Sequence, residues 1–320
     1  MPLKIALWTF GVLIALAVIV LIASFICYMR VFYSPKRKPM GQNDFPLPPG
    51  DIYKPYYPEM IEWMKTIRAM PHETITIKSH DGLSLSGNYY EYKPGAPIEL
   101  LFHGYQGCGE RDLSAGVERC FAIGRSAVII DQRSHGASEG RTTTFGIKER
   151  FDCLTWIEYI TERFGKDTKI ILTGVSMGAA TVMMAAGEKL PENVVCVLAD
   201  CGYSSAKAII KKVIREMGLP ADLLYPFVRL GAFVFGGFKL EETSPLEAVK
   251  RANVPIIFIH GDNDAFVPHS MSAELYEACA SKHKKFVISP GAGHGIAYPV
   301  NKELYIAALR DFEEEAGFLK

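Results

Sequence analysis

A serine flanked by two glycines is the first feature of the chain that could do chemistry. Residues 174–178 have the sequence G-V-S-M-G; they follow the β-branched run KIIL and precede the small, apolar run AATVMMA. In a sharp turn from a strand into a helix, the glycines avoid clashes and the serine hydroxyl stands exposed beside free helix N–H groups. This spacing predicts that Ser176 is a nucleophile.

Two side chains later in the chain could activate this serine. Asp264 and His294 follow the apolar runs PIIFIHG and KFVISPG, which we expect to be strands. The order Ser, Asp, His is the one found where a nucleophile elbow is joined to a parallel sheet. Histidine can take the hydroxyl proton, and an aspartate can fix its tautomer. We predict Ser176, His294 and Asp264 as catalytic residues, with Asp262 as the alternative acid.

Such a site also needs hydrogen-bond donors for the carbonyl oxygen that becomes negative. One candidate is the backbone N–H of Met177, directly after the serine, and the other is that of Tyr105, which ends the segment FHGY. We expect these two groups to form an oxyanion hole. We interpret His103 and His135 as residues that shape loops.

The elements that must position these residues follow a regular rhythm. The segments ETITIKS and LSLSGNYYEY alternate in polarity around Asp81-Gly82, which predicts an antiparallel hairpin. Six apolar runs then alternate with helical patterns; they are IELLFHG, AVIIDQ, KIILTG, VVCVLAD, PIIFIHG and KFVISPG. Runs of this kind are typical of parallel strands buried on both faces. The pattern predicts an α/β fold with a mostly parallel sheet, an antiparallel N-terminal hairpin and helices on both faces.

One insertion interrupts the rhythm at about residues 203–250. We predict that it forms a helical cap over the strand ends. Its segment 223–238 is rich in aromatic and aliphatic residues, and we expect Phe233 and Phe235 to line an acyl pocket above Ser176. Two alternatives stay open: these residues form the cap's own core, or the cap rests on a bilayer with help from the basic stripe at 207–215.

The N-terminus has the pattern of a membrane anchor. Residues 5–29 contain no charge and are long enough to cross a bilayer; a signal peptide is the alternative. Lys4 precedes this run, whereas Arg30, Lys36, Arg37 and Lys38 follow it, which places the rest of the chain in the cytoplasm. We expect an anchor at 1–33, a Pro-rich tether at 34–58 and the α/β domain at 59–320. The anchor is expected to contribute location and not chemistry.

Composition excludes some classes of function. The chain has 35 Lys and Arg against 35 Asp and Glu, so no nucleic-acid partner is indicated. Its seven cysteines are scattered and form no C-x-x-C, which is not a disulfide framework. Neither H-E-x-x-H nor G-x-x-x-x-G-K-[ST] occurs, so the motifs indicate no metal and no nucleotide cofactor.

From about residue 73 to 316 the chain resembles the α/β-hydrolase superfamily. Within it the chain is most similar to bacterial membrane-anchored hydrolases of the serine-aminopeptidase-like or BEM46-like type. The shared motifs are HGY at 103–105, DQRSHGASEG at 131–140, GVSMG at 174–178, HGDNDAFVP at 260–268 and GHG at 293–295. The resemblance implies that Asp264 is the acid of a Ser-His-Asp site that works without metal or organic cofactor.

We therefore expect a serine hydrolase of a carboxylic ester, with a small-molecule or lipid ester as substrate and a membrane partner at the N-terminal helix. A thioesterase or a peptidase would use the same residues. A non-catalytic binding protein on this fold is the alternative from another class. The sequence does not indicate the oligomeric state.

Overall fold

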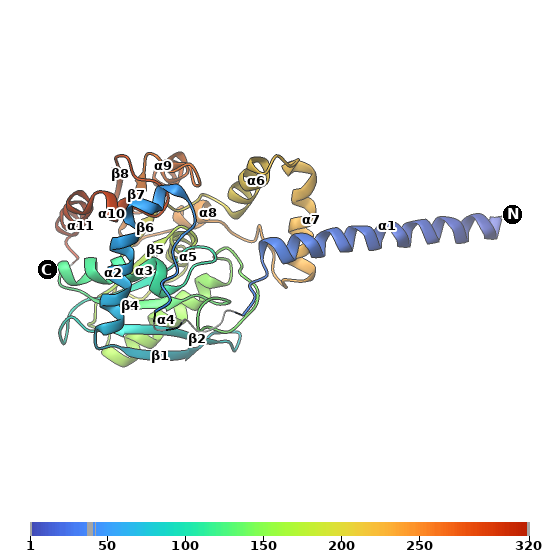
Figure 1. Ribbon diagram of the computed structural model, residues 1–320. Coiled ribbons are helices and arrows are strands. Elements are labelled where there is room, and N and C mark those ends of the chain that lie inside the picture. Colours follow the sequence, from blue (N-terminus) through green and yellow to red (C-terminus); the bar gives the residue numbers. More distant parts are fainter. Residues whose placement is uncertain (1, 37–40, 42, 319–320) are drawn as a thin grey trace.

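The computed structural model describes residues 2–36, 41 and 43–318 (Figure 1). Its centre is an eight-stranded sheet in the order β1-β2-β4-β3-β5-β6-β7-β8. The strands are β1 (Glu73–Lys78), β2 (Ser84–Tyr90), β3 (Ile98–Phe102), β4 (Ser126–Asp131), β5 (Ile170–Val175), β6 (Val194–Asp200), β7 (Ile256–Gly261) and β8 (Lys284–Ser289). β1, β2 and β4 pair antiparallel, and the remaining pairs are parallel. The predicted fold class, with its N-terminal hairpin, is confirmed.

Helices cover both faces of this sheet, whereas α1 (Pro2–Val31) projects away from the domain and α7 (Ala221–Val234) crosses α1 at the side (Figure 1). The other helices of the described chain are the 3-10 helix η1 (Asp51–Tyr56), α2 (Tyr57–Ala69), α3 (Gly109–Ala122), α4 (Glu149–Phe164), α5 (Met177–Ala186), α6 (Ala206–Glu216), α8 (Pro245–Val249), α9 (His269–Ala278), α10 (Ala297–Val300) and α11 (Lys302–Ala316). The side chains of neighbouring strand residues point to opposite faces of the sheet. Leu100 packs in one cluster with Trp156 of α4, whereas Leu101 packs in another with Val117 of α3. Because side chains alternate along a strand, the continuous apolar runs fill two cores at once.

The C-terminal turns of α1 are built into the domain. Tyr28 and Phe32 are buried in one cluster with the apolar residues of α6 and α7. The hydroxyl of Tyr28 lies 2.8 Å from that of Thr142, and the N–H of Thr143 donates to the carbonyl of Phe32 at 2.8 Å. The end of α1 therefore also contributes to the hydrophobic core of the domain, because two large aromatic side chains there belong to a shared cluster.

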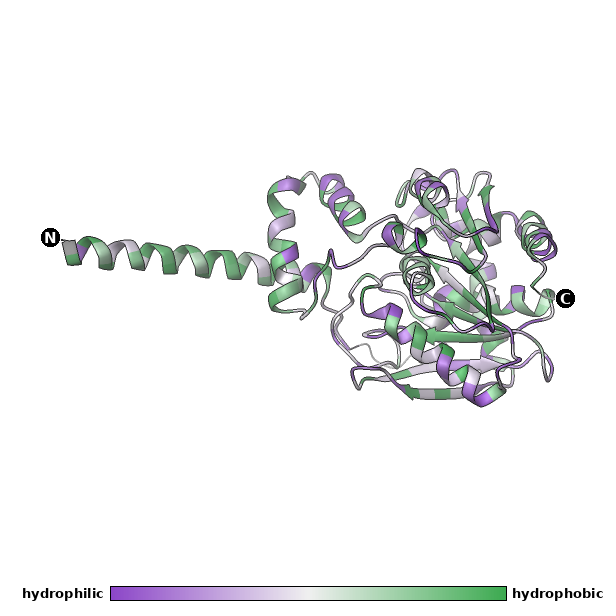
Figure 2. Ribbon diagram, turned by 180° about the vertical axis from the view of Figure 1, so that it is seen from behind, coloured by the Kyte–Doolittle hydropathy of each residue, from purple (hydrophilic) through white to green (hydrophobic). Residues whose placement is uncertain are grey.

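The helical insertion predicted at 203–250 contains α6, α7 and α8. Its position differs from the expectation, because α7 packs across α1 at the side of the domain (Figure 1). Figure 2 shows the colour of hydrophobic residues along α1 and continuing into the adjoining part of α7. α6 contacts the predicted site: Lys212 Nζ donates to the carbonyl of Ala265 at 2.7 Å, and the buried apolar residues of α6 share a cluster with Met177 and Val267. The insertion thus connects α1 with the loop that follows β7.

The Pro-rich segment is not a free tether where the structure describes it. The Arg68 guanidinium lies 4.5 Å from the ring centre of Phe45, and the Tyr57 hydroxyl donates to the carbonyl of Pro48 at 2.7 Å. Pro55 is the fifth of the six residues of the short 3-10 helix η1. Arg37, Lys38 and Pro39 lie outside the described residues. The segment from residue 43 onward therefore lies against the domain as an ordered strap.

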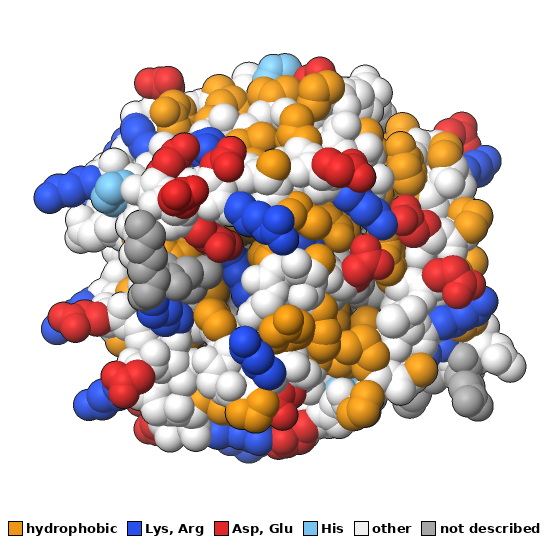
Figure 3. All heavy atoms as spheres, turned by 90° about the vertical axis from the view of Figure 1, so that its left-hand side faces the viewer, with side chains coloured by type: hydrophobic (Ala, Val, Ile, Leu, Met, Phe, Trp, Pro, Cys, Tyr) orange, Lys and Arg blue, Asp and Glu red, His pale blue; other side chains and the backbone are white. Residues whose placement is uncertain are grey.

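The face turned away from α1 carries charges of both signs. Figure 3 shows acidic and basic side chains interspersed with apolar ones on this face, so neither sign forms a continuous patch there. The equal numbers of basic and acidic residues in the sequence are thus also mixed locally on this side.

Candidate active site

Ser176 occupies a strained turn between β5 and α5. Its backbone has φ 56° and ψ −112°, a conformation with positive φ that non-glycine residues rarely adopt. A Cβ on Gly174 would lie 2.1 Å from the backbone of Gly178, and one on Gly178 would lie 2.0 Å from the carbonyl oxygen of Phe102. Both positions of the predicted motif therefore require glycine, and the turn holds the serine hydroxyl at the carboxyl edge of the sheet.

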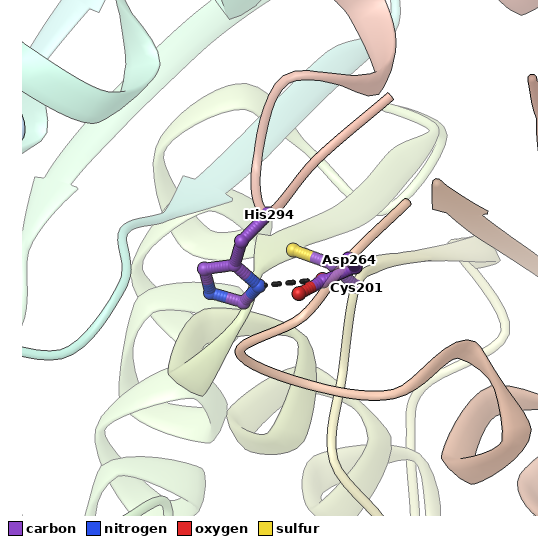
Figure 4. Close-up of side chains that lie close together, drawn as sticks. All are labelled: Cys201, Asp264 and His294. Carbon is purple, nitrogen blue, oxygen red and sulfur yellow. Dashed lines mark hydrogen bonds and ion pairs between the residues drawn. The ribbon is translucent and has the colours of Figure 1, made fainter. Parts of the chain in front are cut away.

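A continuous chain of hydrogen bonds joins the three predicted residues. The hydroxyl of Ser176 lies 2.9 Å from Nε2 of His294, and Nδ1 of His294 lies 2.7 Å from a carboxylate oxygen of Asp264. The three residues come from the loops after β5, β8 and β7. Figure 4 shows the Asp264 carboxylate pointing at the imidazole. In this arrangement the Nδ1–H donates to the carboxylate, so Nε2 can accept the serine proton.

Asp264 is held ionised by its surroundings. One of its oxygens accepts hydrogen bonds from the backbone N–H groups of Phe266 and Val267, at 2.9 and 2.8 Å. Burial alone would raise the pKa of this carboxyl, but hydrogen bonds from His260, His294 and Val267 outweigh burial and lower the pKa to about 2. A carboxylate fixed from both sides can orient an imidazole without taking its proton.

The alternative acid, Asp262, lies elsewhere in the same loop. Its carboxylate accepts the backbone N–H of Gly291 at 2.7 Å and is exposed. This bond ties the loop after β7 to the loop after β8, which carries His294. The geometry therefore brings Asp264 to the imidazole and gives Asp262 a contact between loops.

Sequence reasoning missed His260, a fully buried histidine at the end of β7. Its Nε2 lies 2.8 Å from the carbonyl of Val267 and 3.1 Å from the Asp264 carboxylate, and its Nδ1 lies 2.7 Å from the Ser272 hydroxyl. Two acceptors at Nε2 place the proton on that nitrogen. His260 thus donates to the carboxylate of Asp264 and helps to hold it in place. The available signal was its place four residues before Asp264, at the end of an apolar run.

The two predicted oxyanion donors lie in the elements adjoining Ser176. Met177 is the first residue of α5, and the first N–H groups of a helix have no acceptor within it. Tyr105 follows Gly104, where an added Cβ would lie 3.6 Å from Cβ of Ser176. His103 shapes this loop: its Nδ1 lies 2.7 Å from the carbonyl of Gly104. Both donor positions thus flank the serine.

The side chain of Tyr105 connects this loop with α1. Its hydroxyl donates to the carbonyl of Val31 at 2.8 Å, and its ring lies 5.1 Å from that of Phe145. Val31 is the last residue of α1. The same residue thus contacts the end of α1 through its hydroxyl and carries a predicted oxyanion donor in its backbone N–H.

A cavity of about 540 Å³ opens beside Ser176 and His294. One wall comes from the ordered strap, where residues 48–53 line the space, and a second wall carries Phe266. The aromatic ring of Phe266 lies 5.0 Å from that of His294. Burial raises the pKa of Tyr53 in the strap above its ordinary value. The cavity is mainly apolar, with the hydrogen-bonded serine at its edge, as expected of a small-molecule site.

The sequence comparisons agree with this geometry. The model of the prolyl oligopeptidase family matches residues 141–316, which is more than half of the chain and includes Ser176, Asp264 and His294. The chain belongs to the prolyl oligopeptidase family. This placement agrees with the α/β-hydrolase fold described above.

Individual relatives support the same placement. This prolyl oligopeptidase family member is similar to protein YqkD of Bacillus subtilis, at 28% identity over 191 residues, which cover 59% of this chain and 62% of YqkD. It is also similar to protein bem46 of Schizosaccharomyces pombe, at 27% identity over 233 residues, 70% of this chain and 71% of bem46. The chain thus spans less than two thirds of YqkD. The predicted BEM46-like resemblance is confirmed.

A solved structure shows the same fold. The Pyrococcus furiosus esterase Pf2001 superposes with a TM-score of 0.65 at 21% sequence identity, covering 84% of this chain and 96% of that chain. At this identity the likeness concerns the fold, which agrees with the sheet order and the helical layers described above.

One prediction about this family member has to be corrected. Among the described residues, the cavity is lined by none from 203–250, so Phe233 and Phe235 are not pocket residues. Phe235 instead packs against α1, with ring centres 5.1 Å from Phe25 and 6.0 Å from Tyr28, and Phe233 is 57% exposed. The physical reason is that α1 offers α7 an apolar partner that the sequence does not reveal.

Cys201 lies beside the hydrogen-bonded residues. Its sulfur, the Asp264 carboxylate and the His294 ring lie within 4.8 Å of one another (Figure 4). Burial raises the pKa of the Cys201 thiol well above its ordinary value, so the sulfur is not a thiolate ligand. Both nitrogens of His294 are engaged, one by Asp264 and one by Ser176. This set of groups suits proton transfer better than metal binding.

A second group of possible ligands lies away from the cavity. His80, Asp81 and Asp152 come together near α4, but the Arg133 guanidinium binds both carboxylates, at 2.9 Å to Asp81 and 2.6 Å to Asp152. The Arg133 guanidinium therefore occupies the position that a metal ion would take. Its ion pairs join the β1–β2 hairpin to α4.

Proposed function

We propose that this serine hydrolase cleaves a carboxylic ester with an apolar acyl chain or alcohol. Ser176 is the nucleophile, His294 the general base and acid, and Asp264 the residue that orients the imidazole. The observation that carries the proposal is the unbroken hydrogen-bond chain from Ser176 through His294 to an ionised Asp264, at the edge of a mainly apolar cavity.

The chemistry proceeds in two halves. Oγ of Ser176 attacks the ester carbonyl while Nε2 of His294 takes the hydroxyl proton, and the carbonyl oxygen becomes negative between the N–H groups of Tyr105 and Met177. The tetrahedral intermediate expels the alcohol, which receives the proton from His294. Water then attacks the acyl-enzyme with the same base, which releases the carboxylic acid and regenerates the Ser176 hydroxyl.

The acidic groups around the cavity favour an ester over a peptide with a free amino terminus. Such a peptide would need a carboxylate for its ammonium group. Asp112 is ion-paired with Arg111, and Asp200 accepts the Tyr305 hydroxyl at 3.0 Å. Burial raises the pKa of Asp200 to about 6, and its carboxylate is already engaged by Tyr305. The name of the family makes a peptidase the second candidate, to be tested beside the ester.

The test compares full-length protein in detergent on p-nitrophenyl esters of increasing acyl length, a thioester and an amino-acid anilide. We expect ester turnover to exceed anilide turnover and a fluorophosphonate probe to label the protein. Ser176→Ala should abolish labelling and lower kcat by about 10⁴-fold or more. Faster turnover of the anilide would assign a peptidase, and labelling that survives Ser176→Ala would move the nucleophile elsewhere.

We further propose a single-pass membrane protein with its α/β domain in the cytoplasm and with the boundaries 1–33, 34–58 and 59–320. α1 is long and apolar enough to span a bilayer. Arg30 and Lys36 follow the span and Lys4 precedes it, and positive charge favours the cytoplasmic side. Protease added outside intact cells should leave the domain whole, whereas digestion of the domain would reverse the orientation.

A further inference from the structure

The exposed part of α1 matches the thickness of a bilayer. Every residue from 3 to 22 is exposed, and burial begins at Ala23 and Ser24. At about 1.5 Å of rise per residue, 3–22 form a rod of about 30 Å, which is the thickness of the hydrocarbon core. The surface of a membrane crossed by α1 would therefore lie close to Ser24.

α7 crosses α1 at this level. A Cβ on Gly231 would lie 2.4 Å from the carbonyl oxygen of Ser24 and 3.2 Å from the side chain of Tyr28, so the two helices touch backbone to backbone. One turn further on, Phe235 packs its ring against Phe25. α7 runs transversely to α1 (Figure 1). A helix transverse to the membrane normal lies in the plane of the membrane surface.

The outer face of α7 is apolar. Its buried residues, Ala221, Tyr225, Val228 and Ala232, recur at intervals of four and three and face the domain. We call a second set, two positions further along, the apolar stripe; it consists of Leu223, Phe227, Leu230 and Val234. Two positions correspond to about 200° around a helix, so the stripe lies opposite the buried face. Leu223 is 64% exposed, Val234 is 46% exposed, and Phe233 lies beside the stripe.

The basic residues near α7 already have acidic partners. Lys207 lies 3.3 Å and Arg229 3.7 Å from the Glu241 carboxylate, and Lys211 and Arg215 pair with Asp222. The basic stripe predicted at 207–215 is thus paired within the protein, and the apolar residues are what α7 offers outward. Binding through this face would depend on apolar burial and would need no anionic lipid.

We propose that α7 is a second membrane contact: it lies in the plane of the bilayer surface beside α1, with the apolar stripe buried among the lipids. The apolar surface of α1 continues directly into this face, which makes lipid the occupant that fits. The contact fixes the orientation of the hydrolase domain, because a single span would leave the domain free to rotate and tilt. The proposal does not depend on the identity of the substrate.

The test places spin labels on full-length protein in phosphatidylcholine nanodiscs. The background is Cys27→Ala, because the remaining cysteines are buried. Leu230→Cys places the label in the stripe, Arg229→Cys on the adjacent polar flank, and Glu158→Cys on the exposed surface of α4. Oxygen concentrates in acyl chains and a nickel chelate stays in water. We expect the ratio of their collision rates to be several-fold higher at 230 than at 158, with 229 below 230.

Two outcomes would overturn the proposal. Equal ratios at 230 and 158 would show that the stripe faces water. Dipolar broadening between labels at 230, when two protein copies share a nanodisc, would show that a second copy of the chain covers the stripe. Arg229 and Glu158 are exposed and Leu230 is half-buried, and thermal melts of the three variants check that each cysteine leaves the fold intact.

Discussion

The predicted catalytic residues and α1 are joined to the domain by different forces. Ser176, Asp264 and His294 are placed by a strained turn, close glycine contacts and hydrogen bonds of 2.7–2.9 Å. α1 is placed by aromatic packing of Tyr28 and Phe32 in a cluster that they share with α7. Hydrogen bonds fail when an atom moves by a fraction of an ångström, whereas apolar packing weakens in proportion to the surface lost. We therefore expect changes at the first region to affect rate and changes at the second to affect stability.

Exchange of the acid should have the largest effect and tests the first region. Asp264→Asn replaces the carboxylate that accepts the His294 Nδ1–H. The imidazole is then no longer held in the tautomer whose Nε2 can accept the serine proton, and its charged form is no longer stabilised. We expect kcat to fall by about 10⁴-fold. The matched control is Asp262→Asn, which disturbs only the bond from Gly291 and should cost about 1 kcal/mol of stability with kcat largely kept. The reverse ranking in steady-state kinetics would make Asp262 the acid.

Truncation tests the second region. Deleting residues 2–22 removes the exposed part of α1 and leaves Tyr28 and Phe32 in place, so the melting temperature should be close to that of the full chain. Deleting residues 2–33 removes both buried aromatic side chains, each worth about 3–5 kcal/mol. We expect a fall of about 10–20 °C in Tm. Equal melting of the two truncated proteins in detergent would show that the end of α1 does not stabilise the domain.

Acid should reduce the difference in stability between the wild type and Asp264→Asn. The pKa of Asp264 is about 2 in the folded chain and higher in the unfolded chain, so the ionised carboxylate stabilises the fold above about pH 4. This contribution, about 2 kcal/mol, is lost as the pH falls toward 2. The difference in unfolding free energy between wild type and Asp264→Asn should therefore shrink from pH 5 to pH 2. A constant difference in urea titrations would contradict the lowered pKa.

The smallest effect is expected where the two regions meet. Tyr105→Phe removes the hydrogen bond to the carbonyl of Val31 and keeps both the ring and the backbone N–H. It should cost about 1 kcal/mol of stability and leave kcat unchanged. A clear fall in kcat without unfolding would show that the end of α1 sets the position of the oxyanion loop.

The sequence was sufficient where function depends on local geometry. The glycines at 174 and 178, the strand before them and the order of Asp264 and His294 all follow from short segments and from a sheet whose strands end at one edge. The role of His260 was not predicted, because a buried histidine at the end of an apolar run is common. Its role comes from Val267 and Ser272, which lie beyond its own strand.

The sequence was insufficient where segments distant along the chain pack together. Phe235 meets Phe25 and Tyr28 across some two hundred residues, and nothing in the pattern of either helix names its partner. The aromatic residues of α7 therefore suggested a pocket. The Pro-rich segment was expected to be a tether for the same reason. Its proline content limits the conformation of its backbone but does not indicate the surface against which it packs.

Under the proposed function, that strap would give the N-terminal region a part in selectivity. Because residues 48–53 form a wall of the cavity, exchanging everything before α2 for a foreign anchor and linker would give a chimera with a wider opening beside Ser176. Its preference among acyl chains would differ even though every residue of the α/β domain was retained. Homologues that differ only ahead of residue 57 could on this account diverge in substrate, and grafting the strap together with the anchor would carry the preference along.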